Sequence, residues 1–241
     1  MSTSGDSDQA SRSFWNSKSN KNISKIIRIR QIALKSGPDW SPLSRLSARP
    51  QNDIIKREEN MVPPMEECLS LLKKSRVPEH IIGHSRKVCE IAVCLGRLLN
   101  RQGVGLDEGK IAAASWLHDI AKMDGLHRGE NHSAAGAELL RKLGYPEIAE
   151  IVRQHVVLDA EAYEGEIGEA MVVHYADKRV KHTALVSLED RFRDLKERYG
   201  GHPAARQWLE DLQKRTKDLE TRIFGRLGIS PDSLRSLVEG E

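Results

Sequence analysis

Residues 107–123 read DEGKIAAASWLHDIAKM and combine an apolar helical stripe with two polar residues at its end. His118 follows Ile111 by seven residues and Ala114 by four, so it shares their face in a helix predicted over 107–121. Burying an imidazole costs free energy unless it is hydrogen-bonded or binds a metal. The stretch therefore predicts a buried helix that carries a chemical group into the interior.

The same phase relation recurs on other predicted helices. His84, for example, follows Ile81 by three residues and precedes Val88 by four. A single histidine on an apolar face is more often a hydrogen-bonded core residue than a ligand, but five coincidences favour a shared site. The polar residues in phase with apolar neighbours are His84, His118, His132, His155 and Asp177, and Asp119 adds a sixth group. Imidazoles mixed with carboxylates suit Mn, Fe, Zn, Co or Ni rather than Ca, and six groups can hold one ion or two.

Helical spacing continues almost throughout from Pro64 onward, and no strand alternation is convincing. Asp107 is suited to cap the helix that follows it, and Pro146 to begin another. The fold class predicted is therefore all-α. Besides 107–121, helices are expected at 65–75, 79–102, 132–143, 146–156, 165–181, 184–199 and 203–227, with a short one after 230. The charged run RFRDLKER at 191–198 is expected to be a solvated face.

Residues 1–60 differ from the rest in composition and charge. They hold 11 Lys/Arg and 6 Asp/Glu, whereas the remaining 181 residues hold 27 and 29. We expect this basic segment to be disordered. Two alternatives stay open: KIIRIRQIALK at 25–35 forms an amphipathic helix on a membrane or nucleic acid, or translation starts at Met61.

Composition excludes several classes for the predicted helical part. Its slightly acidic balance gives no reason to expect nucleic acid binding. Three cysteines without a CxxC pair argue against a disulfide framework and favour a reducing, cytoplasmic location. No apolar run approaches the roughly 18 residues of a membrane-spanning helix. The sequence also lacks a P-loop, a dinucleotide fingerprint and a nucleophile elbow.

The order of the polar residues carries a family resemblance. His84, HDIAK at 118–122, His132, His155 and Asp177 resemble the metal-dependent phosphohydrolases of the HD-domain superfamily. The likeness covers roughly residues 64–200. It implies a helical bundle, to which 201–241 would add a C-terminal helical extension, and a homodimer is possible through the helix at 203–227.

The resemblance also implies roles for individual residues. His84, His118, Asp119 and Asp177 would bind the core metal. His132 and His155 would bind a second metal or touch substrate phosphate, and Asp119 would bridge two metals or position the attacking water. Lys122 projects from the same face as Asp119 and would bind phosphate. Arg179, soon after Asp177, is a further candidate for binding substrate phosphate.

Smaller cues concern the substrate. Ala121 gives the form HDxAK, which is similar to that of bacterial symmetrical diadenosine tetraphosphate hydrolases, and HSAAGAELL at 132–140 looks like small bacterial HD proteins. The expected function is therefore metal-dependent hydrolysis of a phosphoester or phosphoanhydride in a small nucleotide-like substrate, by water that the metal activates. The alternative is a non-catalytic HD module that binds a metal or nucleotide and regulates.

Overall fold

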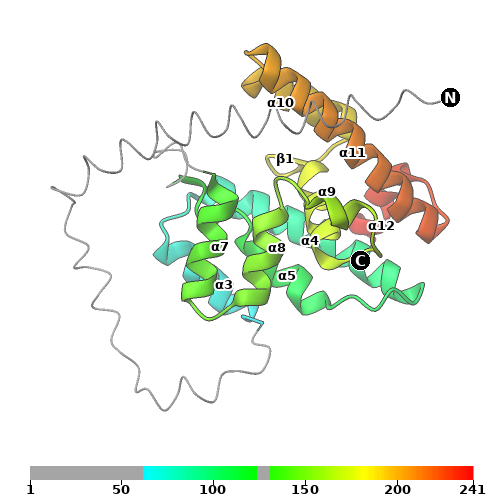
Figure 1. Cartoon of the computed structure of the whole chain (residues 1–241). Helices are drawn as coiled ribbons and strands as arrows, with labels where there is room; N and C mark the ends of the chain where they lie inside the picture. Colours follow the sequence, from blue (N-terminus) through cyan, green and yellow to red (C-terminus); the bar gives the residue numbers. More distant parts are fainter. Residues whose placement is uncertain (1–61, 124–130, 241) are drawn as a thin grey trace. The chain divides into compact units, whose positions relative to one another are not determined.

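The computed structural model describes residues 62–123 and 131–240. The predictions made for residues 1–60 lie outside this range. Within it, the chain forms nine α-helices, two short 3-10 helices and one small β-hairpin (Figure 1). The all-α prediction is confirmed for the described residues.

The elements follow one another in the order that Figure 1 labels. The α-helices are α3 (Met65–Lys74), α4 (Glu79–Arg101), α5 (Glu108–Leu117), α7 (His132–Lys142), α8 (Pro146–Gln154), α9 (Glu169–Lys178), α10 (Leu188–Tyr199), α11 (Pro203–Leu227) and α12 (Leu234–Glu239). The 3-10 helices are η1 (Ala160–Tyr163) and η2 (Pro231–Ser233), and the strands are β1 (Val180–Lys181) and β2 (Ala184–Leu185).

Side chains at the helix starts explain where several helices begin. Asp107 accepts a hydrogen bond from the backbone N–H of Lys110 at 3.0 Å, as predicted for the cap of α5. Ser187 caps α10 in the same way, and Pro146 stands in the first turn of α8. The long helix α11 ends at Leu227 and is capped by Gly228, whose φ of 68° lies in the left-handed region that glycine adopts without strain.

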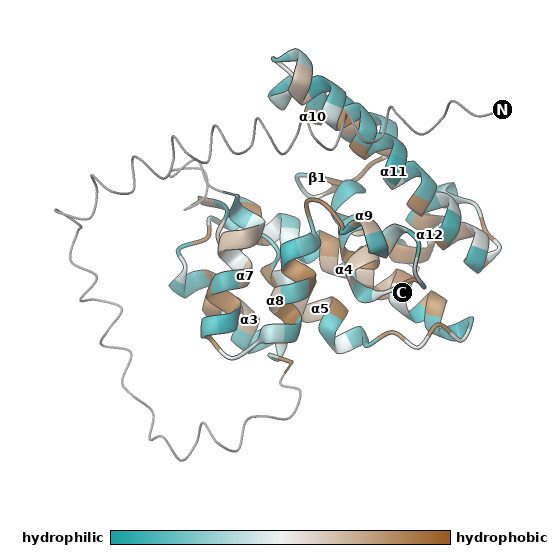
Figure 2. Cartoon of the chain, in the orientation of Figure 1, coloured by the Kyte–Doolittle hydropathy of each residue, from teal (hydrophilic) through white to brown (hydrophobic). Residues whose placement is uncertain are grey.

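The core forms around α4, which packs against α5, α9, α11 and α12. Helix α7 pairs with α8, and α10 pairs with α11. Figure 2 shows hydrophobic residues on α4, α5 and α8 in this region, and many hydrophilic residues along α11. Each fully buried Leu or Ile, such as Ile91, Leu95 and Ile111, contributes about 1.5–3 kcal/mol relative to an exposed one. This apolar packing fixes the helices that carry the six polar residues.

Two helices end earlier than the sequence suggested. The predicted helix 107–121 ends at Leu117, and the predicted helix 146–156 ends at Gln154. After Leu117 the backbone tightens, because the N–H of Ile120 bonds to the carbonyl of Leu117, three residues back. The HD pair therefore lies on a tight turn rather than on a helix.

A hairpin replaces part of two predicted helices, 165–181 and 184–199. Val180 pairs with Leu185 and Lys181 with Ala184, so His182 and Thr183 form a two-residue turn. His182 has a φ of 56°, as the first position of such turns requires. Strands of two residues are too short to show alternation, which explains why the sequence pattern did not predict them.

None of the helices in the described ranges has the length and apolar character needed to cross a bilayer. Cys68, Cys89 and Cys94 form no disulfide in the part of the chain that the structure describes. Burial raises the pKa of the Cys68 and Cys89 thiols to about 12, so they act as small apolar side chains rather than nucleophiles.

Candidate metal centre

The structure brings six of the predicted residues to one place. His84, His118 and Asp119 offer three ligand atoms that all lie within 4.8 Å of one another, and Asp119, His132 and His155 do the same. The sixth residue, Asp177, places Oδ1 3.0 Å from His84 Nε2 and 3.7 Å from His118 Nε2. Asp119 thus stands between two overlapping groups of ligand atoms.

Backbone carbonyls fix which ring nitrogen faces the centre. His84 Nδ1 donates to the carbonyl oxygen of His182 at 3.0 Å, and His118 Nδ1 donates to that of Ser115 at 2.7 Å. His155 Nδ1 likewise donates to the carbonyl of Val152 at 2.7 Å. A carbonyl only accepts, so the proton of each neutral ring lies on Nδ1 and the lone pair lies on Nε2. Such hydrogen bonds orient histidine ligands in metal sites.

Two of these histidines use the same local device at the end of a helix. His118 directly follows α5 and His155 directly follows α8, and each bonds to a carbonyl three residues back. Carbonyls in the last turn of a helix have no partner within it and carry partial negative charge, which favours a nearby cation. The tight turn also brings Asp119 to the same centre, because neighbours on a regular helix point about 100° apart.

Each carboxylate has a lysine partner. Asp119 Oδ2 accepts from Lys122 Nζ at 2.6 Å, and Asp177 Oδ2 accepts from Lys178 Nζ at 2.7 Å. Burial alone would raise the pKa of Asp119, but its interactions with His118 and its hydrogen bonds with His132 and His155 hold that pKa well below its usual range. The pKa of Asp177 is also well below its usual range, since Lys178 and His84 outweigh the effect of burial. Both carboxylates are therefore ionised.

The histidines differ in their tendency to take a proton. Burial lowers the pKa of His155 to about 4, so its ring is neutral at pH 7. Burial acts in the same direction on His118, but the charges of Asp119 and Asp177 prevail and raise its pKa. These carboxylates attract a cation toward His118.

The donor set fits a divalent transition metal. His118 Nε2 is fully buried and has no hydrogen-bond partner, which is costly for a lone pair unless it binds an ion. The Nε2 atoms of His132 and His155 lie 3.1 Å apart, and Asp119 Oδ1 lies 3.3 Å from His132 Nε2. Imidazole and carboxylate groups together are typical ligands of Mn, Fe, Co, Ni or Zn.

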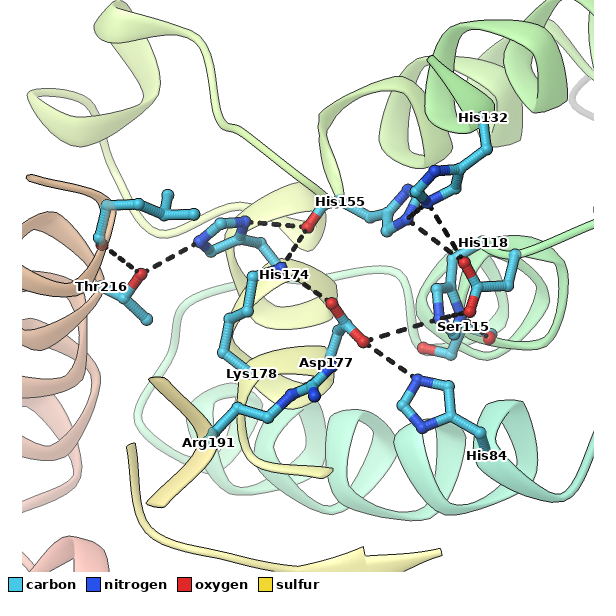
Figure 3. A network of polar contacts seen from close by, with 12 residues as sticks. His84, Ser115, His118, His132, His155, His174, Asp177, Lys178, Arg191 and Thr216 are labelled. Atoms are coloured by element: carbon cyan, nitrogen blue, oxygen red, sulfur yellow. Dashed lines mark hydrogen bonds and ion pairs between the residues drawn. The ribbon is translucent and has the colours of Figure 1, made fainter. Parts of the chain in front are cut away.

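A further set of hydrogen bonds holds the backbone carbonyl of His155 in place (Figure 3). Its backbone carbonyl accepts from His174 Nδ1 and from Lys178 Nζ, both at 3.0 Å. His174 is completely buried, and its Nε2 lies 3.4 Å from Thr216 Oγ1 on α11. Burial holds the pKa of His174 well below its ordinary value, so the ring stays neutral and uncharged beside the centre.

The structure does not bring Arg179 to this centre, contrary to the sequence prediction. Its guanidinium is buried, pairs with Glu220 at 3.3 Å and bonds to the Tyr175 hydroxyl, while Nε donates to the carbonyl of Val186 at 2.7 Å. Arg179 therefore links α9 to α11 and to the segment after the hairpin. Lys178, its neighbour, faces the carboxylate instead.

Two adjoining cavities open beside the candidate metal ligands. One, of about 240 Å³, contains His84, Asp119 and Lys122 in its wall, and the other, of about 170 Å³, contains His132, His155 and Asp177. The residues that sequence reasoning missed are Lys178, Arg191, Arg198, Tyr199 and Trp208, all of which line one cavity or both. Arg191, Leu195 and Tyr199 recur every four residues on α10, a spacing that indicates one shared face.

Known proteins give independent information on this arrangement. The family model of the HD domain matches residues 81–180. That range runs from α4 to β1 and includes all six residues of the centre. The match supports the resemblance of this region to the HD-domain superfamily. No solved structure matches the chain significantly.

Curated relatives are similar at low identity. An uncharacterized protein of Methanocaldococcus jannaschii is 28% identical over 156 residues, which make up 59% of this chain and 90% of that protein. A tRNA (cytidine(56)-2'-O)-methyltransferase of Thermoplasma volcanium is 27% identical over 190 residues, 72% of this chain and 51% of the relative. The enzyme of the same name from Picrophilus torridus is 27% identical over 157 residues, 60% of this chain and 44% of the relative. The chain thus spans about half the length of these methyltransferases.

Proposed function

We propose that this protein is a metal-dependent phosphohydrolase that cleaves a phosphoester or phosphoanhydride bond in a nucleotide-type substrate. One observation carries the proposal. Lone pairs on Nε2 of His84, His118 and His155 converge with two ionised, buried carboxylates, Asp119 and Asp177, beside an open cavity. A divalent metal held there would supply Lewis acidity and lower the pKa of a bound water.

The proposed ligands fall into two groups that share Asp119. His84, His118 and Asp177 would complete the first group around one ion. His132 and His155 would complete the second, and they would hold a second ion or contact substrate phosphate. Because Asp119 belongs to both, it would position the attacking water with respect to the phosphate.

Lys122 would act on the substrate rather than on the fold. Its side chain is 31% exposed, reaches into the cavity and ends 2.6 Å from Asp119. An ammonium group at this point would neutralise a phosphate oxygen as negative charge develops on it. The charge of Asp119 raises the pKa of Lys122 despite its burial, so the lysine is a cation and not a general base at pH 7.

The nucleotide character of the substrate rests on the second cavity. Trp208, Leu209 and Leu212 of α11 line it together with His132 and His155. An aromatic and aliphatic wall beside a phosphate-binding centre suits the flat apolar faces of a nucleobase. Residues 201–241 would then form part of the substrate site as an extension of the domain at 64–200.

The test is phosphate release by the purified full-length chain, supplied in turn with Mn, Fe(II), Zn, Co or Ni. The substrate panel includes nucleoside mono-, di- and triphosphates, dinucleoside polyphosphates and short RNA, since two relatives bear the name of a tRNA enzyme. We expect Asp119→Asn to lower kcat at least about 100-fold. Asp211→Asn, at an exposed carboxylate of α11, is the matched control and keeps full activity.

Removal of metal by EDTA should abolish activity, and adding the metal back should restore it. Metal-independent activity, or full activity in Asp119→Asn, contradicts the proposal. Tight metal binding without turnover of any substrate would favour the alternative of a regulatory HD module.

A further inference from the structure

Three cations beyond the HD-domain match share a single carboxylate. Lys181 Nζ lies 3.1 Å from Asp194 Oδ1, Arg198 Nε lies 3.0 Å from the same oxygen, and Arg191 lies 3.2 Å from Oδ2. Asp194 is buried, with 6% of its side chain exposed. One carboxylate cannot balance three positive charges, so this cationic cluster (Lys181, Arg191 and Arg198) keeps an excess of positive charge.

The cationic cluster faces the metal centre. All three of its members line the 240 Å³ cavity together with Asp119 and Lys122. Arg191 also lines the second cavity, beside Asp177 and Lys178, and Figure 3 shows it on that side of the centre. The described residues that line the two cavities include five lysines and arginines but two carboxylates. Such an imbalance in a concave site attracts an anion.

Arg191 has an unmet donor in this position. Its side chain is 14% exposed, and its Nε is buried without a hydrogen-bond partner. Buried N–H groups are nearly always paired, and arginine offers a planar fork that matches phosphate oxygens. Because Arg191 lines both cavities, an anionic oxygen held there would lie beside an arginine whose hydrogen bonds are incomplete.

We propose that the cationic cluster binds a second phosphate group of the substrate, remote from the phosphate that is cleaved. The protein therefore acts on substrates with at least two phosphate groups, such as nucleoside di- and triphosphates, in preference to monophosphates. This inference rests on the proposed function. The residues of the cluster lie on α10 and on the hairpin. All three come after residue 180, the last residue that the family model matches.

The test measures binding of inorganic tripolyphosphate and of orthophosphate by calorimetry, with the metal-loaded full chain at a fixed excess of free Mn²⁺. Removing one charge-assisted hydrogen bond weakens binding by roughly tenfold or more. We therefore expect Arg191→Gln and Arg198→Gln each to raise the Kd for tripolyphosphate about tenfold, and to change the Kd for orthophosphate less than twofold. Arg193→Gln is the matched control, because Arg193 is an exposed arginine of the same helix that pairs with Asp190.

The opposite result is equally clear. If both variants bind tripolyphosphate within twofold of the wild type, the cluster only ties α10 to the hairpin and the inference is overturned. Arg198, 46% exposed, carries the test even if Arg191→Gln folds poorly. Failure of the proposed function is distinguishable, since the wild type would then bind tripolyphosphate in a variant-sensitive way but hydrolyse no substrate.

Discussion

Replacing Lys178 by methionine tests whether the two lysines of the centre have different tasks. Lys178 is buried, with 5% of its side chain exposed, and it donates both to Asp177 and to the carbonyl of His155. Removing one partner of a buried ion pair costs about 3–5 kcal/mol, because the other charge stays buried. For a domain of this size each kcal/mol lowers Tm by about 2–4 °C, so Lys178→Met should lower Tm by roughly 6–20 °C in EDTA.

Lys122→Met is the matched variant. The Lys122 side chain is 31% exposed, so solvent screens part of its interaction with Asp119, and its loss should lower Tm by only a few degrees. Its effect should appear in hydrolysis instead, with kcat at least tenfold lower. Differential scanning calorimetry in EDTA and phosphate release with metal supply the two readouts. If Lys178→Met melts within 2 °C of the wild type, Lys178 is not the counter-ion that the geometry indicates.

Three further predictions follow from the same contacts. Burial would raise the pKa of Asp194, but Lys181, Arg198 and Arg191 lower it. The ionised carboxylate therefore stabilises the fold fully above the ordinary pKa of 3.8, and this stabilisation disappears as pH falls through the lower pKa of the folded state. Asp194→Asn should reduce Tm at pH 7 and reduce it less near pH 3, and an equal reduction at both pH values would contradict this. Trp208→Ala should raise KM for nucleotides about tenfold and leave the Kd of tripolyphosphate unchanged. An unchanged KM would mean that the apolar lining of the second cavity does not contact the substrate. Saturating the wild type with Mn²⁺ at about 100 times its Kd should stabilise it by about 2.7 kcal/mol in calorimetry, and an unchanged Tm would mean that the folded chain does not bind the ion preferentially.

Helical phase predicted that His84 and Asp177 point inward, and both are buried. His84 and Asp177 lie far apart in sequence, yet each shares a face with apolar neighbours, and the structure places them 3.0 Å apart. This works because a helix that buries one stripe carries every residue of that stripe into the core. The finer likeness to small bacterial HD proteins stays a prediction.

Phase reasoning misplaced the ends of helices where the backbone leaves regular helix. His118 and His155 follow the ends of α5 and α8, and the hairpin carries the carbonyl of His182 that orients His84. Tight turns and two-residue strands depend on local backbone geometry and tertiary contacts, which periodicity does not report. Arg179 has a different cause, because it comes two residues after Asp177 and two steps along a helix turn a side chain by about 200°, away from the centre.

Charge runs were the other source of error. The run at 191–198 reads as a solvated face, but Asp194 is buried among three cations and Arg191 lines both cavities. Alternating charges form ion pairs both on a solvated helix surface and in the lining of a cavity. Composition alone therefore does not distinguish these two cases. The spacing of Arg191, Leu195 and Tyr199 was the available signal.

The most direct test of the metal centre is the metal content of the full-length chain after equilibration with Mn²⁺ and removal of free ion. The wild type should retain one or two ions per chain by elemental analysis. His118→Ala should retain less than a tenth of that amount, because His118 offers a buried lone pair that no other group satisfies. A wild type that retains no metal, or an unchanged content in His118→Ala, would contradict the account.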